Sequence, residues 1–109
     1  QNPTGSVMSE NEIRAIFELA RERDLFILSD EVYARIVYDR QFTSPSVCDH
    51  CDERVIVLGS LSKTYAMTGW RLGYVIAPEL FAEKLAMSVQ TVLSCMPSFL
   101  QYGMTEALI

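Results

Sequence analysis

The chain has 109 residues, the length of a single domain, and half of them are hydrophobic, which is enough for a core. Its net charge is −5, from nine basic and fourteen acidic residues, which argues against nucleic acid as a partner. No apolar run approaches the ~20 residues of a membrane span and no signal-peptide pattern is visible, so we expect a cytoplasmic protein without a membrane partner.

Both ends of the chain look truncated, as if the sequence were part of a longer one. It begins Gln1-Asn2-Pro3 without a start methionine, and it stops at 105–109 within an apparent helix. We therefore expect a piece of a larger protein. A piece of a sheet leaves strand edges and apolar faces bare, so we also expect self-association.

The first quarter of the chain predicts a turn followed by an amphipathic helix. Residues 1–5, Q-N-P-T-G, have the composition of a turn. Ser9 and Glu12 form the S-x-x-E pattern of a capping box, which places the start of the helix at Glu10 and its end near Arg23–Asp24. Apolar residues recur at the spacing of one helical face, at Ile13, Ile16, Phe17 and Ala20.

A buried strand is predicted at Leu25–Leu28, because a continuous apolar run is typical of parallel strands covered on both faces. The strand is followed by Ser29-Asp30-Glu31-Val32-Tyr33. An acid at the carboxyl end of a strand, with a tyrosine three residues later, indicates a binding site. The alternative is that Asp30 only caps a following helical turn.

Residues 32–38 predict a short helical or extended piece, and residues 39–54 predict a polar loop with a CxxC pair, Cys48 and Cys51. A structural zinc site requires four ligands, but the sequence adds only His50 and the distant Cys95. A redox-active CxxC usually opens a helix, and none is predicted here. We therefore expect no metal and interpret the pair as ordinary thiols in a reducing cytosol.

The stretch 55–77 gives the strongest signal for function. It predicts one strand at Val55–Leu58 and another at Leu72–Ala77. Ligands of open α/β sheets bind at strand ends, and here a lysine could form a Schiff base with a carbonyl. An arginine could bind a phosphate through the planar set of donors on its guanidinium group, and serine hydroxyls could donate further hydrogen bonds to the phosphate. The residues that supply these groups are Ser60, Ser62, Lys63 and Arg71.

Two other interpretations of this stretch explain less. A phosphate-binding Walker A loop would require glycine where Val57 and Ser62 stand. A surface lysine after a strand is common, but it would not explain why serines and an arginine cluster around Lys63.

Two helices are predicted after Pro78, the first to about Leu93 and the second over Phe99–Ile109, with an interruption at 94–98. Alternating strands and helices indicate an α/β fold with a mainly parallel sheet flanked by helices.

Four segments, in this order, resemble the class I/II aminotransferases, which are pyridoxal-phosphate enzymes of the aspartate aminotransferase fold. They are Asn2-Pro3-Thr4-Gly5, Ser29-Asp30-Glu31-Val32-Tyr33, Ser60-Leu61-Ser62-Lys63 and Gly69-Trp70-Arg71-Leu72-Gly73. The similarity extends over nearly the whole chain. It implies that residues 1–109 are the central part of the large, cofactor-binding domain, with the N-terminal part and the C-terminal small domain missing.

The resemblance also implies a role for each motif residue. Lys63 would form the Schiff base with pyridoxal phosphate and later shuttle a proton, and Asp30 would keep the pyridine nitrogen protonated. Tyr33 and Asn2 would hydrogen-bond the phenolic oxygen, with a cis peptide between Asn2 and Pro3. The residues implied for the phosphate are Ser60, Ser62 and Arg71.

The activity implied for the parent protein is transamination between an α-amino acid and a 2-oxo acid, in a homodimer with its active site at the subunit interface. A carbon–sulfur lyase, an aminocyclopropane carboxylate synthase or a decarboxylase of the same fold would share the lysine chemistry. A non-catalytic truncated module is a third hypothesis. The family's glycine-rich phosphate loop, its ring-stacking aromatic residue and its substrate-carboxylate arginine all lie outside this sequence.

Overall fold

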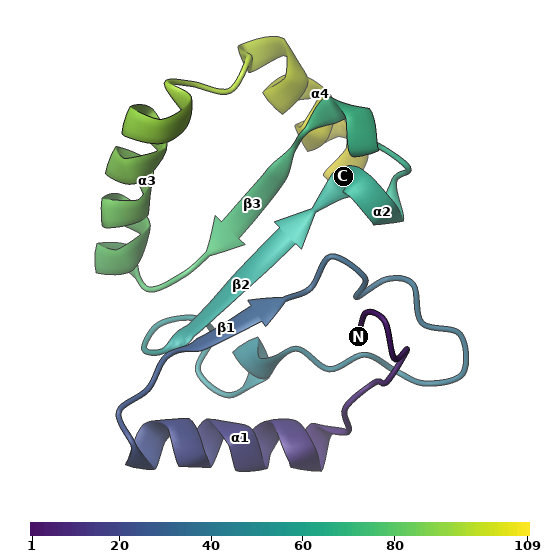
Figure 1. The fold of residues 1–109 in the computed structure, drawn as a ribbon, viewed down its shortest axis with the longest axis vertical. Coiled ribbons are helices and arrows are strands. Elements are labelled where there is room, and N and C mark those ends of the chain that lie inside the picture. The colour runs from purple at the N-terminus through teal and green to yellow at the C-terminus, as the bar shows by residue number, and fades with distance from the viewer.

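The computed structural model describes residues 1–109 and contains a three-stranded sheet flanked by helices (Figure 1). The strands are β1 (Ile27–Asp30), β2 (Val55–Ser60) and β3 (Gly73–Ile76). The α-helices are α1 (Glu10–Glu22), α2 (Leu61–Thr64), α3 (Glu79–Leu93) and α4 (Ser98–Leu108). Two short 3-10 helices are η1 (Pro45–Val47) and η2 (Thr68–Trp70).

The strand order is β1-β2-β3, so β2 is the central strand. β1 runs parallel to β2, with Asp30 opposite Leu58, whereas β3 runs antiparallel to β2, with Gly73 opposite Ser60. The α/β class is confirmed, but the prediction of a mainly parallel sheet is wrong for these strands, which form a mixed sheet. The link from β2 to β3 contains only α2 and η2 and no helix long enough to carry the chain back along the sheet, so β3 returns in the opposite direction.

The first strand begins two residues later than predicted and is not buried on both faces. The chain leaves α1 through Asp24, whose backbone is left-handed with φ 51°, and the Leu25 amide still donates to a carbonyl of that helix. Pairing starts where the Ile27 amide donates to the Arg54 carbonyl at 2.9 Å. Half-buried and exposed residues then alternate, and Leu28 is 65% exposed, so one face of β1 points outward in this chain.

Helix α1 starts where the sequence predicts, and its capping box is confirmed. Ser9 Oγ accepts from the Glu12 amide at 3.4 Å, and Glu12 Oε2 accepts from the Ser9 amide at 2.7 Å. Hydrogen bonds from the backbone and then the side chain of Ser9 lower the pKa of the Glu12 carboxyl. Two of the helix's otherwise unpaired amino-terminal groups are therefore satisfied by one pair of residues.

The core lies between α1 and β2. Phe17 of α1 packs in one cluster with Val55 and Val57 of β2 and with Cys51 of the preceding loop. The apolar face of α1 is buried except for Ile16, which lies at its margin and is 42% exposed. The central strand is thus fixed to the first helix by apolar contacts.

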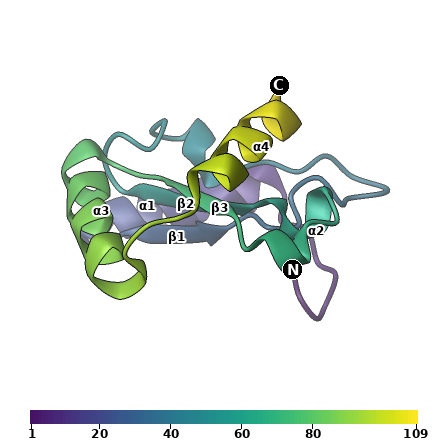
Figure 2. The ribbon, with the colours of Figure 1, turned by 90° about the horizontal axis from the view of Figure 1, so that it is seen from above.

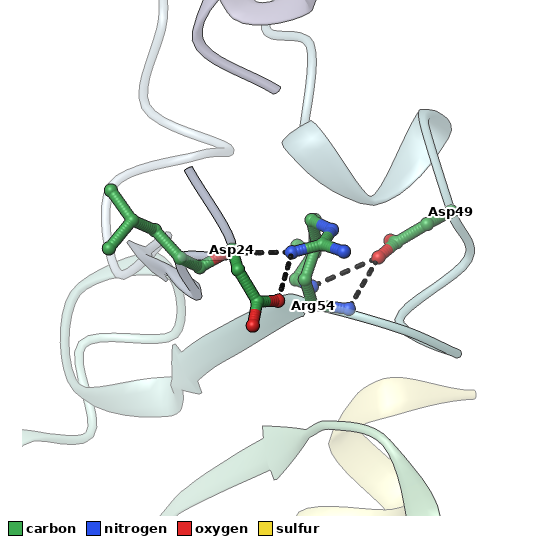
Figure 3. Close-up of polar contacts among 5 residues, drawn as sticks. Asp24, Asp49 and Arg54 are labelled. Atoms are coloured by element: carbon green, nitrogen blue, oxygen red, sulfur yellow. Dashed lines mark hydrogen bonds and ion pairs between the residues drawn. The ribbon is translucent and has the colours of Figure 1, made fainter. Parts of the chain in front are cut away.

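A single carboxylate organises the loop that leads into β2 (Figure 3). Asp49 Oδ2 accepts from the amides of Arg54 at 2.8 Å and Val55 at 3.0 Å, and Oδ1 accepts from the amide of Cys51 at 3.0 Å. His50 and Cys51 have left-handed backbones, with φ 53° and 62°, so the loop bends sharply here. The carboxylate gives the amides of this bend a partner and so sets the point where β2 begins.

Arg54 ties the same loop to the end of α1 (Figure 3). Its Nη1 donates to the Leu25 carbonyl at 3.1 Å and lies 3.7 Å from Asp24 Oδ1. The Arg54 side chain is largely buried, whereas Asp24 is fully exposed. The ion pair therefore adds little stability, and the hydrogen bond to the carbonyl fixes the guanidinium.

The two helices predicted after β3 are confirmed as α3 and α4, which follow one another beyond that strand in Figures 1 and 2. Helix α3 contacts the segment before β1 through Phe81 and Phe26, whose ring centres are 6.0 Å apart. Helix α4 meets η2 at Gly103, where a Cβ would stand 3.2 Å from a ring carbon of Trp70. Glycine therefore permits this close approach.

None of the helices combines the length and the apolar character that crossing a membrane requires.

We expect Asp49→Ala to lower the free energy of unfolding by about 2 kcal/mol, because it removes three hydrogen bonds to a charged acceptor and leaves the bend's amides unpaired. Urea unfolding followed by circular dichroism measures this change. Asp52→Ala is the matched control, because Asp52 is exposed and its carboxylate accepts no hydrogen bond from the chain. Equal losses in the two variants would show that Asp49 does not organise the loop.

Candidate active site

The predicted site residues approach one another at one end of the sheet. β1 and β2 are parallel, and Asp30, the last residue of β1, pairs in register with Leu58, two residues before the end of β2 at Ser60. Lys63 belongs to α2, which begins directly after β2. Figures 1 and 2 place the N-terminus at this same end of the sheet. The pairing of parallel strands thus unites segments that are far apart in the sequence.

The N-terminal turn is joined to the segment after β1. Asn2 Nδ2 donates to Tyr33 Oη at 3.5 Å, the long limit for a hydrogen bond, and the Asn2–Pro3 peptide is cis, as the resemblance implied. Asp30 Oδ1 accepts from the Val32 amide at 3.2 Å, so this residue does cap a turn, over 32–35. Its Oδ2 makes no hydrogen bond within the chain and remains available to a ligand.

Ser60 and Ser62 lie at the start of α2, and Lys63 follows them. Ser60 Oγ accepts from the Ser62 amide at 3.1 Å and donates to the Leu72 carbonyl at 3.1 Å, so the backbone already uses this hydroxyl. Leu61 is fully buried and anchors the short helix. Lys63 is exposed, and its amine forms no ion pair or hydrogen bond with the chain.

Arg71 lies at the end of η2, in a left-handed conformation with φ 56° and ψ 41°. Its Nη1 donates to the Thr68 carbonyl at 3.1 Å, and no carboxylate pairs with it. The next residue, Leu72, accepts the hydrogen bond of Ser60 and is buried. Arg71 is therefore linked to the start of α2 through its neighbour, without a direct contact to Ser60, Ser62 or Lys63.

A cleft of about 590 Å³ adjoins this end of the sheet, and the sequence did not predict it. Among the predicted site residues, only Ser60 lines it. Arg35, Arg40 and Tyr65 contribute polar groups to its wall, and Tyr74 reaches it from β3. The Tyr74 ring crosses over Gly59, where a Cβ would stand 2.1 Å from a ring carbon. No motif marks these residues, because their proximity arises only from the pairing of strands.

The cysteines of the CxxC pair are free and are not grouped with other possible metal ligands. Cys48 is half-buried, Cys51 is buried and Cys95 is exposed, and all three are free thiols. No group of three or more histidine, cysteine or acidic side chains is arranged to hold a metal ion. Burial raises the pKa of both the Cys48 and the Cys51 thiol, which leaves little reactive thiolate at neutral pH.

The fold and the site together define an α/β protein with an unpaired lysine beyond a strand end. The whole chain, residues 1–109, matches the family of class I and II aminotransferases, and it therefore belongs to this family. The family uses pyridoxal phosphate.

Individual relatives agree with this assignment. The chain is 43% identical to aromatic-amino-acid aminotransferase 2 of Thermococcus litoralis and 41% identical to aspartate aminotransferase of Pyrococcus abyssi, in each case over 109 residues. These alignments cover 98% of this chain and 28% of each relative. The crystal structure of an aromatic aminotransferase from Pyrococcus horikoshii matches with a TM-score of 0.92 and 39% identity, over 98% of this chain and 29% of that one. The chain thus spans less than a third of the length of these relatives.

We expect iodoacetamide at pH 7.5 to alkylate Cys95 at least about tenfold faster than Cys48 or Cys51, because only exposed thiolate reacts. The rates at Cys48 and Cys51 should continue to rise as the pH passes ~8.5, the ordinary thiol pKa, since their pKa values lie above the usual range. Timed digestion and mass spectrometry measure the three rates, and the urea-unfolded chain is the control. Rapid alkylation of Cys51 in the folded chain would favour the redox interpretation instead.

Proposed function

We propose that residues 1–109 form the central part of the large, cofactor-binding domain of a pyridoxal-phosphate-dependent aminotransferase. The protein would transfer an amino group between an α-amino acid and a 2-oxo acid. The observation that supports this most strongly is the exposed, unpaired amine of Lys63, placed by α2 at the strand ends that also present Asp30. Relatives with 41–43% identity that are named as aspartate and aromatic aminotransferases favour amino transfer over the lyase and decarboxylase alternatives.

The side chains at the candidate site suit each functional group of pyridoxal phosphate in turn. An aldehyde requires a free primary amine, and Lys63 provides one without an ion pair. A pyridinium nitrogen requires a carboxylate oxygen, and Asp30 keeps Oδ2 unbonded while Oδ1 orders the turn. A phosphate requires a cation without a carboxylate partner, which describes Arg71. The phenolic oxygen requires hydrogen-bond donors, and the contacting pair of Asn2 and Tyr33 supplies them.

When bound, pyridoxal phosphate supplies a carbonyl carbon that takes up the amino group and a ring that withdraws electrons from the substrate's α-carbon. Lys63 would hold the cofactor covalently through its ε-amine and, once displaced by substrate, would move the α-proton. The Asp30 carboxylate would stabilise the protonated ring nitrogen, because an opposite charge nearby favours the charged form.

The phosphate would be held by Arg71, Ser60 and Ser62. Arg71 offers a planar fork of donors that suits phosphate. Ser62 has its hydroxyl free, whereas Ser60 would have to release the Leu72 carbonyl before its hydroxyl could donate to a phosphate oxygen. Ser60 would thus act first as the N-cap that shapes α2 and only second as a ligand.

The whole activity requires parts of the protein beyond these residues. The relatives are more than three times as long as the stretch they share with this chain. We propose that the rest of the large domain, a small domain and a second subunit complete the site, as the family resemblance implies. The substrates would be small molecules, an α-amino acid and a 2-oxo acid, without nucleic acid or membrane.

In the full-length protein that contains this chain, Lys63→Ala should abolish amino transfer and the cofactor's covalent attachment. Borohydride reduction followed by mass analysis of the peptides measures the attachment, and production of a new amino acid from 2-oxoglutarate measures the transfer. Lys84→Ala is the matched control, because Lys84 is an exposed lysine of α3. Undiminished turnover in Lys63→Ala would refute the role of Lys63, whereas release of pyruvate and ammonia by the unaltered protein would indicate a lyase.

Asp30→Ala should leave the cofactor attached to Lys63 but slow removal of the substrate's α-proton by ~10²-fold or more, as for the loss of one preorganised electrostatic partner. Stopped-flow absorbance with an α-deuterated substrate isolates this step. Asp39→Ala serves as the control, because Asp39 is exposed and lies outside the candidate site. A rate within about threefold of the unaltered protein, less than ~1 kcal/mol of barrier, would contradict the pairing of Asp30 with the ring nitrogen.

A further inference from the structure

One side-chain hydrogen bond connects the segment after β1 with the segment that contains Lys63. Arg35 Nη1 donates to Tyr65 Oη at 2.7 Å, and Arg35 Cζ lies 5.8 Å from the centre of the Tyr65 ring, within the range of a cation–π contact. Arg35 follows Tyr33 by two residues, and Tyr65 follows Lys63 by two residues. No other side-chain hydrogen bond joins residues 31–38 to residues 61–71.

Both partners project from turns with their own backbone hydrogen bonds. Arg35 ends the turn over 32–35, in which the Ala34 amide donates to the Glu31 carbonyl at 2.9 Å. Tyr65 caps the carboxyl end of α2, and its amide donates to the carbonyl of the fully buried Leu61 at 3.2 Å. A contact between two ordered turns fixes the position of one relative to the other.

The strands alone fix the two segments only as far as their last paired residues. The β1–β2 pairing ends at Asp30 and Leu58, followed by one more bond from the Glu31 amide to the Leu58 carbonyl at 2.9 Å. The register of paired residues ends here, and the Lys63 side chain has no hydrogen bond or ion pair of its own. Arg35 also has no carboxylate partner, so its hydrogen bond to the Tyr65 hydroxyl is the polar contact that holds its guanidinium group.

We propose that Arg35 and Tyr65 form a positioning pair that sets the Lys63 amine relative to Asp30 and Tyr33. This inference rests on the proposed function of Lys63. Neither residue need touch the cofactor, so both act through the backbone turns from which they project. Together with the contact of Asn2 to Tyr33, the pair links the N-terminal turn, the β1 turn and α2 in one series of contacts.

The test uses the full-length protein that contains this chain, stripped of cofactor. Tyr65→Phe removes the acceptor and keeps the ring, and Arg35→Met removes the donor and keeps most of the apolar stem. Tyr38→Phe is the control for the first, because Tyr38 is 93% exposed and forms no hydrogen bond. Arg23→Met is the control for the second, because Arg23 is exposed at the end of α1 and its side chain forms no ion pair or hydrogen bond. The rate of covalent attachment to Lys63 is measured against pyridoxal phosphate concentration by borohydride trapping and mass analysis.

We expect each of Tyr65→Phe and Arg35→Met to lower the maximal attachment rate about fivefold, as for the loss of one partly exposed hydrogen bond of a charged donor. The double variant should be no slower than either single variant, because both remove the same contact. The half-saturating cofactor concentration and the thermal unfolding midpoint should not change, and both controls should match the unaltered protein.

Three other outcomes would overturn this proposal. Maximal rates equal to that of the unaltered protein would show that the pair does not position Lys63, while the proposed function would stand. A lower unfolding midpoint with an unchanged maximal rate would assign the pair a purely structural role. Absence of attachment to Lys63 in the unaltered protein would refute both this inference and the proposed function.

Discussion

The parallel pairing of β1 with β2 is the constraint on which the candidate site depends. It brings the last residue of β1, Asp30, to the same edge of the sheet as the start of α2. The pairing is stabilised from one side by Phe17 of α1, which packs on Val55 and Val57. It is stabilised at its amino end by Asp49, whose carboxylate fixes the loop that enters β2. The residues that hold the strands together are therefore different from the residues that we propose to be chemically active.

The second constraint is the short antiparallel return from β2 to β3. Leu61 and Leu72 are buried at the two ends of this link, and Ser60 hydrogen-bonds across it. Local bonds of this kind keep the link compact, so Lys63 can be exposed and still occupy a defined place. Apolar faces of β1 and α3 that remain bare in this chain fit the proposal that further parts of a longer protein cover them.

The candidate site residues could be proposed from the sequence because their signals are local. The Asp30–Tyr33 and Ser60–Lys63 segments each follow a strand signal, and the capping box of Ser9 and Glu12 located the start of α1 to the residue. The errors arose where neighbours decide the structure. The apolar run from Leu25 to Leu28 predicted a strand buried on both sides, but the carboxyl-terminal turn of α1 takes up its first residues and one face has no cover.

The sequence by itself determined the α/β class and the helices α1, α3 and α4, and it supplied the candidate site residues, because helical spacing, capping and motif spacing are properties of adjacent residues. Only the tertiary structure decided the direction of β3, the contact of Asn2 with Tyr33 and the bond from Arg35 to Tyr65. Arg35 and Tyr65 are separated by the whole of the loop before β2 and by β2 itself, and no local pattern encodes their proximity. Their contact exists because the pairing of β1 with β2 brings two distant turns to one edge of the sheet.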